Sequence, residues 1–386
     1  MSTENTTGIH LFPLTKKYLD QNLTLRELLN LDTRSSQIQP VLIDIVEKLS
    51  RRKNCVDLIK NYESDRFSEP ATLKQRELIN LANIMYQNVP KDYEDIELSP
   101  VAPLGTNSIL TEVSQKAVIS TVRNTEVLSD PTTMLALESA RRQRDLAKGG
   151  TSVDFVTNLC TSVRCIRGQI FSKESGFIPH FQLFSMSSGG LPSNGLMIGK
   201  INEHIETYLN VLNDKNSNNL YSANTIEVAF SDINLTESLI KSQNIDRKEL
   251  GRHSQDKEFD FFRSNSIDLP NSVSEVNEID YHKMDKYGLL RHYGSFQKIF
   301  SDIQILRKKY PTIKFYFNLD RIAGIGYYNG SCFKITAKNN RSEEFPLADG
   351  GYSDWLAKLL SNKKISYFSS GFGLELFGNR FKKNDV

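Results

Sequence analysis

The order of helix-like and strand-like segments is the feature that most limits the fold of this chain. Apolar residues recur at helical spacing over about 72–88 and 293–310. Strand-like segments lie at Arg164–Phe171 and Pro179–Met186, and again at 313–319, 327–337 and 369–377. The strands follow one another in runs, and helices do not alternate with them one by one. This order favours an α+β fold over a doubly wound parallel sheet.

Two of these segments predict a pair of adjacent antiparallel strands. Arg164–Phe171 and Pro179–Met186 are joined by Ser-Lys-Glu-Ser-Gly, which is a loop of hairpin type. A further half-buried strand is expected at 93–100, where apolar and polar residues alternate until Pro100.

The pattern divides the chain into three parts. Helical spacing at 23–31, 39–50 and 55–62 predicts a helical N-terminal extension over residues 1–70. The main domain is expected at 71–378. It includes a polar insertion with loops at about 191–279, because this part is rich in Asn, Ser and Asp. Residues 379–386 are expected to form a short basic tail.

Composition excludes several classes of protein. With 48 Lys and Arg against 46 Asp and Glu, the net charge is +2, and a protein that coats nucleic acid needs a concentrated excess of basic residues. No apolar run approaches the 18–20 residues or so that cross a membrane, and the first residues do not form a secretory signal.

Four cysteines are too few for a disulfide scaffold, so we expect a cytoplasmic protein with free thiols. No metal site is expected, since Cys160 and Cys165 have no second ligand pair at zinc-finger spacing.

Three short segments resemble the catalytic core of class II aminoacyl-tRNA synthetases, in particular the histidyl-tRNA synthetase family. Residues 323–333, Ala-Gly-Ile-Gly-Tyr-Tyr-Asn-Gly-Ser-Cys-Phe, resemble the family segment R-G-L-D-Y-Y-T-G-x-x-F. Gly350-Gly351-Tyr352-Ser353-Asp354 resembles G-G-R-Y-D, and 371–376 resembles the G-x-G-x-E-R end of class motif 3. The three segments occur in the family's order. The resemblance implies an antiparallel sheet flanked by helices and extends over roughly residues 72–377.

The resemblance also assigns roles to individual residues. Residues 81–100 are similar to class motif 1, which implies a homodimer. Residues 127–132 resemble the L-R-P-E-x-T loop, so that Asp130 and Thr132 would hold the ammonium group of an amino acid, with Tyr328 in the same site. Residues 164–169 and 180–182 resemble motif 2. They would place Arg167 at the ATP phosphate, Gln169 at the motif glutamate and Phe181 on adenine; ATP with Mg²⁺ is the implied cofactor.

Several positions depart from the family pattern. The family's catalytic arginine falls on Ala323 and the motif 3 arginine on Leu376, so two fixed positive charges are missing. Leu183 and Ser187 stand where the family reads histidine, which argues against a histidine-specific pocket. The chain ends at Val386, so we expect no anticodon-binding domain and no tRNA binding by that route. This architecture resembles the regulatory subunit of ATP phosphoribosyltransferase, a paralogue that does not charge tRNA.

Each assigned residue also has a purely structural interpretation. Asp130 is a suitable N-cap for a helix at 133–148. Arg167 would otherwise pair with an acidic residue such as Glu174, and Phe181 would otherwise fill the core. Tyr327 and Tyr328 would occupy the two faces of a strand.

Three hypotheses for the function follow. The first is a non-charging paralogue that binds an amino acid or adenine nucleotide in a regulatory or sensing role. The second is a ligase that adenylates an amino acid or small carboxylate and transfers it to an acceptor other than tRNA, with Arg164 and Arg167 on the phosphates and Glu375 holding Mg²⁺. The third is an interaction scaffold built around the N-terminal helices.

Overall fold

The computed structural model describes residues 35–149, 155–168, 178–191, 197, 199–253, 256 and 259–383. The longer helices are α3 (Ser35–Ser50), α4 (Cys55–Ser64), α5 (Gln75–Asn88), α7 (Pro131–Lys148), α8 (Lys200–Asn213), α10 (Ile233–Ser242) and α14 (Tyr293–Lys309). The shorter helices are α6 (Thr106–Leu110), α9 (Lys215–Leu220), α11 (Arg247–Arg252), α12 (Phe261–Ser264), α13 (Tyr281–Lys286), α15 (Trp355–Leu360) and α16 (Leu374–Arg380). None of the described helices is long and apolar enough to cross a lipid bilayer.

The strands of the described residues form a large, mostly antiparallel sheet and a small one. The strands of the large sheet are β1 (Glu94–Asp95), β4 (Thr157–Ile166), β5 (His180–Gly190), β6 (Asn224–Asp232), β7 (Ser272–Val273), β8 (Lys314–Asn318), β9 (Ser331–Lys338), β10 (Glu344–Ser353) and β11 (Ser366–Phe372). Their order is β1-β4-β5-β11-β10-β9-β6-β8-β7, in which β1 with β4 and β6 with β8 are parallel. The second sheet pairs β2 (Val101–Pro103) with β3 (Thr125–Val127). The predicted α+β class is therefore confirmed.

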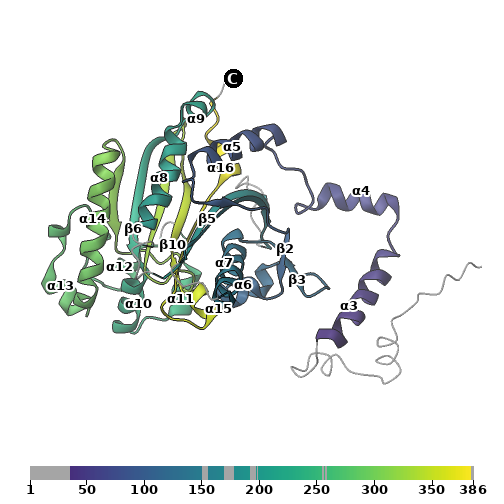
Figure 1. Ribbon diagram of the computed structural model, residues 1–386, viewed down its shortest axis with the longest axis horizontal. Helices are drawn as coiled ribbons and strands as arrows, with labels where there is room; N and C mark the ends of the chain where they lie inside the picture. Colours follow the sequence, from purple (N-terminus) through teal and green to yellow (C-terminus); the bar gives the residue numbers. More distant parts are fainter. Residues whose placement is uncertain are drawn as a thin grey trace, which may run out of the picture.

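Helices cover both faces of the large sheet (Figure 1). Side chains alternate between faces along a strand, and on β11 the even-numbered residues Phe368 and Ser370 contact His204 of α8. The odd-numbered Tyr367 instead contacts Trp355 of α15 and Thr132 of α7. We call the side of α7 and α15 the α7 face and the other side the α8 face; α5, α14 and α16 also lie on the α8 face.

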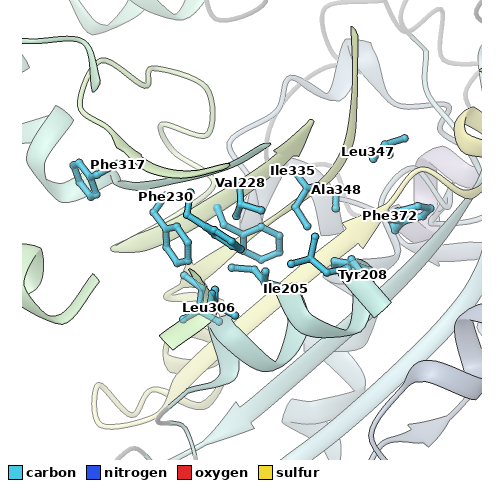
Figure 2. Close-up of a cluster of buried hydrophobic side chains, with 14 of the residues drawn as sticks. Ile205, Tyr208, Val228, Phe230, Leu306, Phe317, Ile335, Leu347, Ala348 and Phe372 are labelled. Carbon is cyan, nitrogen blue, oxygen red and sulfur yellow. The ribbon is translucent and has the colours of Figure 1, made fainter. Parts of the chain in front are cut away.

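The main hydrophobic core lies on the α8 face (Figure 2). Phe230, Phe317 and Phe333 are cross-strand neighbours on adjacent strands, so their side chains form an apolar row on one face of the sheet. Ile205 and Tyr208 of α8 pack onto this row, because the apolar residues of α8 recur at helical spacing and are buried. The core packs against the α8 face of the sheet. The polar side chains of the candidate site can therefore lie on the α7 face.

The predicted elements agree with the structure to different extents. Helix 72–88 corresponds to α5, 293–310 to α14, and 133–148 to α7. The strand pair is confirmed by the antiparallel register of β4 and β5, although β4 begins at Thr157 and the connecting loop lies outside the described residues.

Of the expected strand 93–100, only Glu94–Asp95 is a strand. Strand β10 was not predicted, since glycine weakens a strand pattern.

The segment 191–279 differs from a looped insertion. It contains α8, whose inner face is buried, and β6, an internal strand between β9 and β8. The sequence analysis did not predict α8 or β6, because Asn-rich and Asp-rich stretches next to them interrupt the apolar periodicity on which a prediction depends. The limits of the domains themselves remain a prediction.

The N-terminal helices α3 and α4 project away from the body of the molecule (Figure 1). Helix α4 begins with a capping box in which Asn54 and Asp57 bond each other's backbone N–H groups. None of its residues is buried. Both helices expose large apolar side chains. These are Leu42, Ile45, Val46 and Leu49 on α3, and Val56, Leu58, Ile59 and Tyr62 on α4.

Candidate functional site

Asp130 begins helix α7 and also faces the site. Its Oδ1 accepts hydrogen bonds from the backbone N–H of Thr132 at 3.0 Å and from the Thr132 hydroxyl at 2.6 Å. Pro131 occupies the first helical turn, where its missing N–H costs nothing. The capping role considered from the sequence is therefore present. It leaves Oδ2 free to accept from elsewhere.

That second oxygen accepts from Tyr327. The Tyr327 hydroxyl lies 2.8 Å from Asp130 Oδ2 and 2.7 Å from the Thr132 hydroxyl. Burial and the nearby Asp130 carboxylate raise the pKa of Tyr327 well above its usual value, so the phenol keeps its proton. Asp130, Thr132 and Tyr327 together form what we call the Asp130 cluster.

The Asp130 cluster has more acceptor sites than hydrogens. A carboxylate only accepts, and the two hydroxyls contribute one hydrogen each while retaining lone pairs. Both hydrogens are already used within the cluster. A group with several donors and no acceptor, such as an ammonium, complements this arrangement.

Tyr327 and Tyr328 lie in a turn, not in the strand that the sequence predicts. Strand β9 begins only at Ser331, and the N–H groups of Tyr327 and Tyr328 both donate to the carbonyl oxygen of Gly324. Gly324 has φ +97°, a conformation that favours glycine. The turn therefore directs both tyrosines onto the α7 face of the sheet.

Tyr328 reaches a second carboxylate. Its hydroxyl donates to Asp349 Oδ1 at 2.6 Å, and Arg321 Nη2 lies 2.9 Å and 2.8 Å from the two Asp349 oxygens. Burial and then the Asp349 carboxylate raise the pKa of Tyr328 well above its usual value. Arg321, Tyr328 and Asp349 form what we call the Arg321 cluster.

Arg321 is a cation that the sequence analysis did not identify. Its side chain is 7% exposed, and its Nε donates to the carbonyl oxygen of Ala323 at 2.8 Å. Burial alone would lower the pKa of Arg321, but Asp349 raises it overall, so the guanidinium is charged. A guanidinium therefore lies beside the position that lacks the family's arginine. The sequence signal was an arginine two residues before Ala323.

Small residues form the sheet surface beneath the turn. Gly351 pairs with Ser369, and Gly371 pairs with Ser185. A Cβ atom on Gly351 would lie 2.7 Å from the Tyr328 ring, so Tyr328 packs directly on the backbone there. A Cβ atom on Gly371 would meet Ser185 Oγ only at 3.6 Å, which is an ordinary contact.

Arg167 and Phe181, the predicted nucleotide residues, are in contact. The Arg167 guanidinium carbon lies 5.1 Å from the centre of the Phe181 ring, in a cation–π arrangement. Arg167 Nε also lies 3.4 Å from the carbonyl oxygen of Ser129, next to Asp130. The pair therefore adjoins the Asp130 cluster. Phe181 is partly buried against the apolar group around Leu128, so both of its expected roles are compatible with the structure.

Glu375 lies apart from this group. Its Oε2 accepts from Arg164 at 3.0 Å and from the backbone N–H of Gln182 at 2.9 Å, and its side chain is 3% exposed. Arg164 is the cross-strand partner of Gln182, so it points to the face opposite Phe181. The positive charge of Arg164 beside Oε2 does not fit Mg²⁺ at this carboxylate, whose other oxygen, Oε1, is buried without a hydrogen-bond partner. No group of acidic, His or Cys side chains among the described residues forms a metal cluster.

The structure thus brings most of the predicted site residues to one face. Asp130 and Thr132 meet through Tyr327, Arg167 and Phe181 lie beside them, and Tyr328 joins the adjacent Arg321 cluster. Gln169 lies outside the described residues. Tyr327, Arg321 and Asp349 complete the site, and their partners are too distant in sequence for a local pattern to reveal.

Comparison with solved structures identifies the fold of this chain. No protein-family model matches the chain, and no curated protein matches it. Among solved structures, an ATP phosphoribosyltransferase regulatory subunit/histidyl-tRNA synthetase from Bacillus halodurans is 16% identical, with a TM-score of 0.59 over 83% of this chain and 84% of that one. The chain has the fold of a class II synthetase core.

Two further structures support this conclusion. Histidyl-tRNA synthetase from Nostoc is 13% identical, with a TM-score of 0.57, over 80% of this chain and 72% of that one. A histidine–tRNA ligase subunit from Alicyclobacillus acidocaldarius is 14% identical at the same TM-score, over 80% of this chain and 96% of that one. At these identities the comparison establishes the fold alone.

Proposed function

We propose that this protein binds an amino acid on the α7 face of its sheet and acts in a regulatory or sensing role without charging tRNA. The observation that carries the proposal is the Asp130 cluster, whose excess of acceptors suits an ammonium group. Thr132 is buried and Asp130 is half-buried, so an ammonium placed there is shielded from bulk water and held more strongly than at an open surface.

The distribution of positive charge argues against efficient adenylation. In-line transfer at the α-phosphorus needs fixed cations around the phosphates. Ala323 and Leu376 carry none, Arg164 is committed to Glu375, and Arg321 is committed in part to Asp349. Of these three arginines, Arg167 remains beside the Asp130 cluster. One cation supports binding of a phosphate more readily than stabilisation of a pentacovalent transition state.

The second candidate is a ligase that adenylates an amino acid or small carboxylate for an acceptor other than tRNA. The contact of Arg167 with Phe181, next to the Asp130 cluster, favours it. An aromatic ring and a guanidinium are the groups that hold a purine and a phosphate. On this hypothesis ATP binds next to the amino acid.

We also propose that the protein is a homodimer. Apolar side chains are exposed on α5, at Ile79, and on the segment that follows β2, at Leu104, Ile109 and Val113. Exposed apolar groups of this kind are common at subunit contacts. Sedimentation at micromolar concentration tests this proposal. A dimer is the expected species, and a monomer would contradict it.

Pyrophosphate exchange and calorimetry together test the function. Exchange between ATP and labelled pyrophosphate is measured with each of the twenty amino acids, and the binding of each amino acid and of ATP is measured in parallel. We expect binding of at least one amino acid without exchange. Exchange with any amino acid would establish the ligase instead. If no amino acid and no ATP binds, both candidates fail and the scaffold hypothesis remains.

A further inference from the structure

The guanidinium of Arg321 has a nitrogen with no acceptor. Nε donates to Ala323 and Nη2 to Asp349, whereas Nη1 is buried and has no hydrogen-bond partner. Each Nη carries two hydrogens. A buried donor without an acceptor is costly, and more so when the donor is charged. The guanidinium also lies over the Tyr328 ring, with its central carbon 5.6 Å from the ring centre, but a ring offers no lone pair to Nη1. Such a nitrogen in a native protein calls for an acceptor, which water or a bound ligand can supply.

Two hydroxyls on the same face also have no acceptor. Ser353 lies on the strand that carries Asp349, four residues further along, and its side chain is 6% exposed. Ser369 is the cross-strand partner of Gly351, and it is 1% exposed. The Oγ atoms of both serines are buried without a hydrogen-bond partner. Alternation along β10 and β11 directs both side chains to the α7 face, as it directs Asp349.

This end of the site is accessible although Arg321 itself is covered. The Asp349 side chain is 41% exposed, so solvent reaches the carboxylate to which Arg321 is fixed. The ion pair holds the guanidinium in place, and a fixed guanidinium loses little freedom when it binds a further acceptor. The two clusters are linked by neighbouring rings, because the ring centres of Tyr327, in the Asp130 cluster, and Tyr328, in the Arg321 cluster, lie 4.8 Å apart.

The geometry points to Arg321 as the receptor for the carboxylate of the bound ligand, through Nη1, with the Asp130 cluster as the receptor for its ammonium. This inference rests on the proposed function and specifies it. The ligand is a zwitterion, that is, an amino acid with a free α-carboxylate. Amino-acid amides and esters are poor ligands, because they present no anion to Arg321.

Matched ligands test the inference on the intact protein. Calorimetry compares each of the twenty amino acids with its α-carboxamide and with its des-amino carboxylic acid. We expect the amide of the binding amino acid to bind about tenfold to a hundredfold more weakly, the range for loss of a hydrogen bond between charged groups. In the variant Arg321→Met/Asp349→Asn, which removes both charges together, the ratio of the two affinities should fall to about one.

Two controls keep the experiment decisive. The double variant leaves no unpaired buried charge, and circular dichroism reports whether it folds. If it does not fold, Arg321→Lys is used in its place. Lysine keeps the charge but loses the planar donor geometry, so this variant should reduce the ratio of the two affinities in part. Arg141→Met removes an exposed arginine that pairs with Glu138, and it should leave the ratio unchanged.

Each outcome decides between the two claims. If an amino acid binds and its amide binds equally well, or if the ratio survives in the Arg321 variant, Arg321 is not the receptor although the proposed function stands. If only des-amino acids bind and the binding depends on Arg321, the carboxylate receptor is supported and amino-acid binding fails. If neither class binds, both claims are wrong.

Discussion

The hydroxyl of Tyr327 lies 2.8 Å from the carboxylate of Asp130, although 197 residues separate the two along the chain. The adjacent Tyr328 reaches a different carboxylate, that of Asp349. One turn therefore links the start of α7 to strand β10. Because these contacts join the two halves of the site, a change in any of the four side chains should alter ligand binding.

Asp130→Asn is expected to weaken amino-acid binding while the protein stays folded. Asparagine is as good an N-cap as aspartate, but it lacks the charge that attracts an ammonium. Calorimetry should show at least a tenfold loss of affinity, since a charged hydrogen bond contributes about 1.5–3 kcal/mol. Asp280→Asn makes the same change at the N-cap of α13 and should have no effect. Equal affinity in the two variants would contradict the role of Asp130.

Arg167→Ala is expected to weaken ATP binding without unfolding the protein. Arg167 is half-buried and is held by the Phe181 ring and one carbonyl oxygen, so its removal costs little stability. Calorimetric titration with ATP measures the effect, and circular dichroism checks the fold. Wild-type affinity in the variant would exclude Arg167 from the nucleotide site.

Glu375→Gln is expected to destabilise the protein by about 2–3 kcal/mol, because it leaves Arg164 without its anion in a partly buried place. Urea unfolding measures this difference. Addition of Mg²⁺ should not change the unfolding midpoint of the wild-type protein, since the carboxylate is engaged with a guanidinium. A stabilisation by Mg²⁺ that disappears in the variant would restore the cation site.

His204 should make the protein less stable in acid. It is buried between the Tyr93 hydroxyl and the Ser370 hydroxyl, at 2.8 Å and 2.7 Å. Burial, with a smaller effect of Lys200, lowers its pKa well below the usual value. The folded protein therefore holds this ring neutral, whereas the unfolded chain binds a proton below about pH 6.5. The stabilisation is complete above that pH and is lost as the pH falls.

The variant His204→Gln measures this contribution. Between pH 7.5 and 5.5, the loss in free energy of unfolding should be smaller in the variant by about 1.4 kcal/mol, the value for one proton over one pH unit below the unfolded pKa. Urea unfolding at several pH values gives the slope for both proteins. Identical slopes would show that His204 takes up its proton over the same pH range in the folded and the unfolded protein.

Local patterns in the sequence were sufficient for much of the fold. Helices α5 and α14 follow from apolar spacing, α7 follows from its Asp130-Pro131 start, and the pairing of β4 with β5 follows from two strand-like segments with a short connection. These features depend on residues close together in the chain, where periodicity and capping act. The motif segments also led to the class II synthetase fold that the solved structures support.

The tertiary structure decided how the site is assembled. Ala323 indicated a lost cation, but the fold places the Arg321 guanidinium beside it. Glu375 of α16 was expected to hold Mg²⁺, but Arg164 of β4 lies 3.0 Å from its Oε2. The segment 191–279 contains a helix and an internal strand of the sheet. In each case the deciding partner is distant in sequence. The sequence by itself determined the elements that have a clear local pattern, whereas the charge of each site group depends on which side chains the packed sheet brings within hydrogen-bonding distance.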